Sequence, residues 1–164
     1  MSRSIVLVST LLLAISFTAV AQTIKNPKLS PADLATAQSV VSDVGKQGAE
    51  LTYATRIDAA QKGSYDTLVI IYAKPGNSGK DYFGLVVRGD QKYPLKIDKF
   101  GRAVKAGDRF LRMGIRHVEG QAPLVRLMAS ANEPGKGEVQ RNVDYQFNGQ
   151  DFALIAQSTS PIAK

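Results

Sequence analysis

The side chains that could do chemistry in this chain are mainly cations gathered in its middle. Residues 88–116 contain nine Lys and Arg residues and three Asp residues, a local charge of +6. In the rest of the chain after residue 21, acids and bases balance at 11 each. Such a segment raises the local concentration of anions. The candidate anion-binding residues are Arg88, Lys92, Lys96, Arg102, Lys105, Arg109, Arg112 and Arg116.

Strand periodicity gives these cations a predicted arrangement. Lys92 and Lys96 share one face of a predicted strand, and Arg112 and Arg116 share one face of another. If both strands lie in one sheet, the four cations line one outer surface. The alternative is the solvated polar face of an ordinary sheet. Phe110 is the only ring on that face, which argues against single-stranded nucleic acid, because its binding needs aromatic stacking.

Enzymatic signatures are scarce. His117 is the only histidine, no Gly-x-Ser-x-Gly elbow accompanies it, and no cysteine is present. One histidine without cysteine cannot form a typical zinc site. P-loop, dinucleotide-binding and calcium-loop motifs are also missing. The sequence therefore predicts no catalytic residue, no metal site and no cofactor.

A pair of carboxylates is the one catalytic device that the sequence leaves open. Glycoside hydrolysis needs two acids that meet in space and can lie far apart along the chain. The acids of this chain fall mostly at predicted turns and strand ends, where solvated acids are common. A small hydrolase with an unlocated carboxylate pair thus remains an alternative.

The N-terminus has the pattern of a secretory signal peptide over residues 1–21. Arg3 supplies positive charge, residues 5–17 form an apolar run, and Ala19-Val20-Ala21 offers a cleavage site after Ala21. The run is shorter than the ~20 residues of a membrane span, so an uncleaved anchor is the less favoured alternative. We expect a periplasmic or secreted protein with no transmembrane segment in the mature chain. The lack of cysteine favours a bacterial envelope, because small domains of eukaryotic secretion are often rich in disulfides.

The remaining chain predicts an extended lead-in (22–29), one globular domain (30–157) and a loose tail (158–164). Ser30 has the position of an N-cap, with Pro31 as the first residue of a helix that ends at Gly45 or Gly48. The predicted apolar stripe of this helix is Leu34, Ala37, Val41 and Val44.

Beyond residue 49 the pattern is that of strands and turns. The apolar runs at 66–73 and 82–87 predict a central antiparallel hairpin, covered on both faces. Asn148-Gly149 suits a two-residue hairpin turn. Residues predicted to be almost fully buried in the central hairpin are Val69, Ile71, Leu85 and Val87. The predicted strands are 51–58, 66–73, 82–87, 92–98, 109–119, 124–129, 139–147 and 150–157.

Together these features predict an α+β, mostly β fold, with one N-terminal helix packed on an antiparallel sheet or partly closed barrel of about eight short strands. The favoured function is that of an exported, non-enzymatic binding or envelope-structural domain. Its cationic surface would meet an anionic polymer, anionic lipid headgroups or an acidic protein, and nucleic acid is disfavoured. There are two alternatives. One is the small hydrolase, and the other is a subunit of an envelope protein assembly whose two-sided apolar strands pack against another chain.

Overall fold

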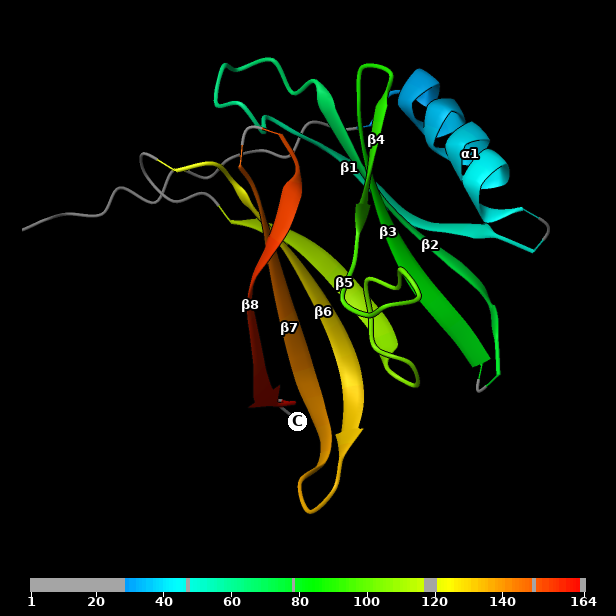
Figure 1. Ribbon diagram of the computed structural model, residues 1–164, viewed down its shortest axis with the longest axis vertical. Coiled ribbons are helices and arrows are strands. Elements are labelled where there is room, and N and C mark those ends of the chain that lie inside the picture. Colours follow the sequence, from blue (N-terminus) through cyan, green and yellow to red (C-terminus); the bar gives the residue numbers. More distant parts are fainter. Residues whose placement is uncertain (1–28, 47, 78, 117–120, 149, 163–164) are drawn as a thin grey trace, which may run out of the picture.

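The computed structural model describes residues 29–46, 48–77, 79–116, 121–148 and 150–162. This part holds one helix, α1 (Pro31–Gly45), and eight strands (Figure 1). The predicted signal peptide, residues 22–28 of the lead-in, and His117 lie outside the described residues. The strands are β1 (Glu50–Ile57), β2 (Thr67–Gly76), β3 (Gly79–Arg88), β4 (Gln91–Leu95), β5 (Arg109–Arg116), β6 (Leu124–Glu133), β7 (Gly137–Phe147) and β8 (Phe152–Pro161).

The eight strands form two four-stranded antiparallel sheets. Sheet A has the order β1-β2-β3-β4, and sheet B has the order β5-β6-β7-β8. Within each sheet, every strand pairs with the next one in the chain, so both sheets are simple meanders. Figure 1 shows α1 on one side of sheet A and sheet B on the other. The predicted mostly β fold with an N-terminal helix is confirmed, and the strands divide between two packed sheets.

Helix α1 starts where the sequence predicts. The Ser30 hydroxyl accepts a hydrogen bond from the Asp33 amide, and the Asp33 carboxylate accepts one from the Ser30 amide, each at 3.1 Å. This reciprocal capping box satisfies two amides that no helical carbonyl can reach. The prediction for Leu34 is wrong, because its side chain is 43% exposed. The face that packs on sheet A is formed by Ala37, Val40 and Val41, with Val44 partly buried beside them.

The β2–β3 hairpin is apolar on both faces because each face has its own cover. On one face Leu68, Ile70 and Tyr72 of β2 pack against α1. On the other face Val69 and Ile71 face the inter-sheet core. Antiparallel pairing over ten residue pairs confirms the predicted hairpin. Of the four residues predicted as buried, Val69, Ile71 and Leu85 are, whereas Val87 is only half-buried.

The main core lies between the two sheets. Sheet A contributes aliphatic side chains, and sheet B adds larger side chains from β5 to β8. Close packing of both inner faces removes this surface from water, which is the principal stabilising term of such a fold. Its buried members include Ile57, Val69, Ile71, Val86, Leu95, Met113, Val125, Leu127, Val143, Tyr145, Phe147 and Phe152.

A β-bulge near the start of β5 changes the predicted alternation. The register shifts between Phe110 and Arg112, so that Leu111 is the extra residue. A bulge moves the side chains before it to the other face of the sheet. Phe110 therefore reaches the inter-sheet core and contacts the ring of Tyr82, with ring centroids 5.8 Å apart. Leu111, expected in the core, is 39% exposed, while Met113 and Ile115 keep their predicted face.

Two predictions at the C-terminal hairpin are wrong. Phe147 pairs with Phe152, so four residues connect β7 and β8 where Asn148-Gly149 predicts two. The tail also does not begin at residue 158, because β8 continues to Pro161, which pairs with Val139. After Phe152 the side chains of this edge strand are exposed, apart from half-buried Ser160, so no buried alternation marks where it ends.

The crossover segment, residues 96–108, is the chain connection from sheet A to sheet B. The Ala103 amide donates to the carbonyl of Tyr82 on β3 at 3.1 Å, and the Tyr145 hydroxyl on β7 donates to the Ala103 carbonyl at 3.4 Å. Ala103 and Val104 are buried. Nearer β5, the Arg141 Nε donates to Asp108 at 2.7 Å. The crossover is thus irregular, as predicted, but fixed to both sheets.

Candidate functional site

The two pairs of cations predicted to share one surface lie in different sheets. Lys92 belongs to β4, the edge of sheet A, and Lys96 follows it directly. Lys92 is opposite Val87, on the side of sheet A that also carries α1. Arg112 and Arg116 belong to β5, on the outer face of sheet B. Since the main core separates the sheets, these two pairs occupy opposite sides of the molecule.

Two of the candidate cations hold the fold together. Arg102, with its side chain 15% exposed, is bound by two carboxylates, Asp98 at 2.8 Å and Asp81 at 3.1 Å. Arg88 pairs with Asp66 at 3.3 Å, and its guanidinium lies 5.1 Å from the centre of the Phe147 ring. A guanidinium whose donors are already engaged offers little to a ligand. We therefore remove Arg88 and Arg102 from the candidate binding surface.

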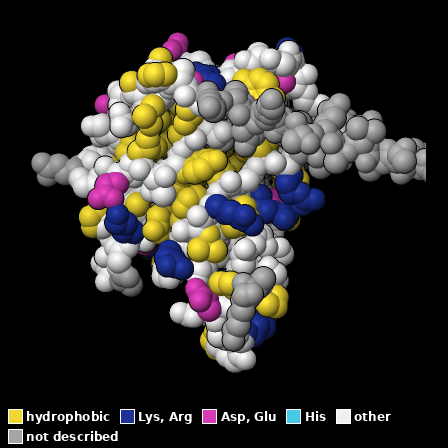
Figure 2. Space-filling model, turned by 180° about the vertical axis from the view of Figure 1, so that it is seen from behind, with side chains coloured by type: hydrophobic (Ala, Val, Ile, Leu, Met, Phe, Trp, Pro, Cys, Tyr) yellow, Lys and Arg dark blue, Asp and Glu magenta, His cyan; other side chains and the backbone are white. Residues whose placement is uncertain are grey.

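The other candidates are exposed. Lys105 lies on the crossover segment, and Lys92 and Lys96 lie at the edge of sheet A. The greatest concentration is on β5, which carries Arg109, Arg112 and Arg116. Figure 2 shows the Lys and Arg side chains of the rear face in separate groups, with hydrophobic and uncharged side chains between them. The basic segment of the sequence is thus divided between the edge of sheet A, the crossover segment and β5.

The three β5 arginines, here called the arginine row, differ in their partners. The side chain of Arg109 is 71% exposed and reaches Glu138 only at 4.0 Å. The Nε of Arg112 donates to the sulfur of Met128 at 3.2 Å, which is a weak acceptor. In the part of the chain that the structure describes, neither Arg112 nor Arg116 forms an ion pair within 4.0 Å. Both side chains are exposed.

A polar surface that sequence reasoning missed continues from the arginine row across sheet B. Arg126 of β6 forms a two-point ion pair with Asp144 of β7, and the hydrogen bonds that its guanidinium donates to this carboxylate raise the pKa of Arg126. Beside them, the Gln140 amide donates to Asn142 at 2.8 Å. The sequence feature that could have revealed this surface is the alternation of polar residues along β7. The outward positions of β7 are Glu138, Gln140, Asn142, Asp144 and Gln146.

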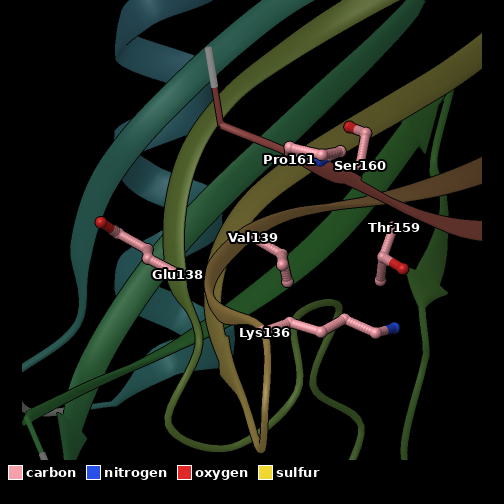
Figure 3. A pocket seen from close by; sticks show the side chains of 6 residues that line it. All are labelled: Lys136, Glu138, Val139, Thr159, Ser160 and Pro161. Atoms are coloured by element: carbon pink, nitrogen blue, oxygen red, sulfur yellow. The ribbon is translucent and has the colours of Figure 1, made fainter. Parts of the chain in front are cut away.

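Each of two hollows in the described part of the molecule is lined by a single acid. One, of about 250 Å³, lies at the open end of β7 and β8. Its single acid, Glu138, points away from Lys136 (Figure 3). The other, of about 340 Å³, lies beside the β2–β3 turn and also has one acid, Glu50, which pairs with Lys80 at 2.5 Å. A glycosidase needs two carboxylates around one cleft.

Among the described residues, no three His, Asp or Glu side chains come together as metal ligands. Within the same ranges, no helix has the length and apolar character to cross a membrane.

Comparison with known proteins gives no relative from which a function could be transferred. No family model, no curated protein and no solved structure matches this chain.

Proposed function

We propose that the protein is an exported, non-enzymatic binding domain that holds an anionic polymer on the outer face of sheet B. The observation that carries the proposal is the pair Arg112 and Arg116, exposed on one strand face without a carboxylate partner among the described residues. Residues four apart on a strand are separated by about 13 Å. The two cations thus fit successive charges of an extended polymer better than one compact anion.

The exposed guanidinium groups, rather than the neighbouring amides, favour an acidic polysaccharide as the partner. Asn142 is buried, and the Gln146 amide already donates to the Ala122 carbonyl at 3.0 Å. In the described part of this face no aromatic ring is present, so a stacked neutral sugar lacks a platform. Guanidinium groups pair well with carboxylates, which supports an acidic polysaccharide of the envelope. The export half of the proposal rests on Arg3, the apolar run and Ala19-Val20-Ala21.

Two double variants of equal charge test this proposal. Arg112→Glu/Arg116→Glu reverses the row, and Lys92→Glu/Lys96→Glu reverses the exposed pair on the other side of the molecule. Affinity for an acidic polysaccharide is measured from low to high salt, with thermal unfolding as the check on folding. We expect the arginine variant to weaken binding by about tenfold or more and to flatten its salt dependence, since fewer counterions are released. The lysine variant should bind almost as the unmodified chain does.

The outcomes distinguish binding at a specific site from attraction by the net charge of the protein. Equal loss in both double variants would mean that net charge alone drives association. Absence of binding at low salt in the unmodified protein would remove the polymer from consideration. Export is tested independently, by N-terminal sequencing of the protein recovered from an expressing bacterium. The expected first residue is Gln22, and an intact Met1 on cytosolic protein would contradict export.

Assembly into a larger envelope structure is a second candidate, and β8 is the observation that favours it. The two-sided strands β2 and β3 are covered within the chain, so they offer no such surface. Strand β8 is the edge of sheet B, carries no charged residue, and exposes Leu154 and Ile155. Uncharged edge strands readily accept another strand. Ile155→Lys should abolish any self-association seen by analytical ultracentrifugation, and a strictly monomeric protein would exclude this route.

A further inference from the structure

The most exposed large hydrophobic side chain in the described part of the protein is Phe100, at 65%. It lies in the crossover segment, away from both sheet cores. A phenyl ring held in water is unfavourable, because its apolar surface stays hydrated. Contact with a partner that has an apolar region would remove this surface from water.

The turn that presents Phe100 is held by several hydrogen bonds. The Asp98 carboxylate accepts from the amides of Phe100 at 2.8 Å and Arg102 at 3.1 Å. The Ile97 amide donates to the Arg102 carbonyl at 2.7 Å, and Gly101 has a φ of +83°, which favours glycine. Arg102 is itself anchored to Asp81 on β3. This Phe100 turn, residues 97–102, thus holds its ring outward.

Cations surround the ring. The Lys99 Nζ and the Arg102 Cζ each lie 5.0 Å from the ring centre. Lys96 and Lys105 are exposed on the same crossover segment. Asp98 is the only acid between residues 96 and 105, and Arg102 already binds it. Asp108, at the far end of the segment, is bound by Arg141, so both acids of the crossover segment already have an arginine partner.

We propose that the Phe100 turn docks on an anionic phospholipid surface, with the phenyl ring among the headgroups and the lysine ammonium groups on the phosphates. An apolar ring beside flexible cations matches the headgroup boundary, where the ring leaves water and the cations remain at the polar level. A soluble polyanion satisfies the lysines but gives the ring no apolar surroundings. Because the turn is already ordered, docking loses little conformational entropy. This surface is separate from the arginine row and does not depend on the proposed polymer site.

The absence of tryptophan from the sequence makes a direct test possible. Phe100→Trp places a unique fluorophore on the turn, and Ile155→Trp places one on β8, where the native side chain is 49% exposed. Each full-length variant is titrated with vesicles of phosphatidylglycerol and phosphatidylethanolamine, with vesicles of phosphatidylcholine, and with dextran sulfate. We expect a blue shift, and quenching by brominated acyl chains, for Phe100→Trp with the anionic vesicles alone. The Ile155→Trp emission should not change.

The lysines are tested in the same background. Adding Lys99→Gln/Lys105→Gln to Phe100→Trp should raise the lipid concentration for half-maximal shift by about tenfold at low salt. The control, Lys62→Gln/Lys136→Gln, removes two exposed lysines outside the crossover segment and should leave the titration nearly unchanged. A shift as large with dextran sulfate as with vesicles would overturn the lipid proposal in favour of a polymer. So would an unshifted Phe100→Trp spectrum, or equal shifts for both tryptophan positions.

Discussion

Arg126 and Asp144 are direct partners across β6 and β7, joined by two parallel hydrogen bonds, Nε to Oδ1 at 2.7 Å and Nη2 to Oδ2 at 2.6 Å. The Asp144 side chain is only 9% exposed, and the Arg126 guanidinium compensates this nearly buried carboxylate. The pair therefore adds no net charge to the polar face. It affects the stability of sheet B and leaves the net charge of the arginine row unchanged.

Removing the cation of this pair should destabilise the protein. Arg126→Met leaves a nearly buried carboxylate without its partner, and we expect a loss of about 2 kcal/mol in the free energy of unfolding. The measurement is urea denaturation at neutral pH. Arg126→Met/Asp144→Leu removes both charges and should recover part of the loss. A double variant that is less stable than Arg126→Met would contradict this interpretation.

The ion pair at the start of α1 predicts a pH dependence. Hydrogen bonds from the Arg56 side chain, and then from the Ser30 amide, lower the pKa of Asp33 from 3.8 to about 2. Because the pKa is lower in the folded state, the stabilisation is present above pH 4 and disappears as the pH falls towards 2. The denaturation midpoints of the wild type and Asp33→Asn should differ at pH 6 and converge near pH 2. A difference independent of pH would show that the charge of Asp33 is not the cause.

The helix cap and the helix face should differ in their effect on stability. Ser30→Ala removes the acceptor of the Asp33 amide and should cost about 1 kcal/mol. Val41→Ala empties a position that is 3% exposed against sheet A and should cost more, about 2 kcal/mol. Thermal or urea denaturation measures both. An unchanged midpoint for Val41→Ala would mean that α1 contributes little to the fold.

Two glycines in the middle of strands form a matched pair of tests. A Cβ at Gly84 would lie 2.7 Å from the Leu95 Cβ and 3.1 Å from the Ala103 Cβ, so Gly84→Ala should destabilise by about 2 kcal/mol. A Cβ at Gly114 would meet only the flexible end of Met128 at 3.4 Å. Gly114→Ala should therefore be close to neutral in the same denaturation assay. Equal effects at both sites would show that close packing around Gly84 does not decide the outcome.

Local patterns in the sequence were sufficient to predict the elements of this fold. The capping residues located the start of α1, and apolar runs and alternation located the eight strands, because these signals depend on neighbours along the chain. The sheet to which a strand belongs does not depend on its neighbours along the chain. Nothing local to residues 92–98 or 109–119 states that they belong to different sheets. The bulge at Leu111 likewise depends on how β5 pairs with β6.

The candidate site could be predicted only in part, for the same reason. Charge density along the chain found the exposed arginines of β5, but it could not separate them from Arg88, whose partner Asp66 lies 22 residues earlier, just before β2. The Asp98–Arg102 pair is four residues apart and was accessible to sequence reasoning. The exposure of Phe100 could not be predicted from the sequence, because it follows from how hydrogen bonds hold the crossover segment against both sheets.

The crossover segment also has a consequence for how the chain reaches its folded state. Each sheet consists of consecutive strands, so neither meander needs contacts from the other half of the chain to form its hairpins. Each half alone would leave its side of the main core in water, so docking of the halves is the step that stabilises both. Cleavage between Ala106 and Gly107, both exposed, should thus yield fragments 1–106 and 107–164 that recover the strand circular dichroism signal only when mixed. Such complementation would identify docking, rather than closure of a long loop, as the cooperative event in folding.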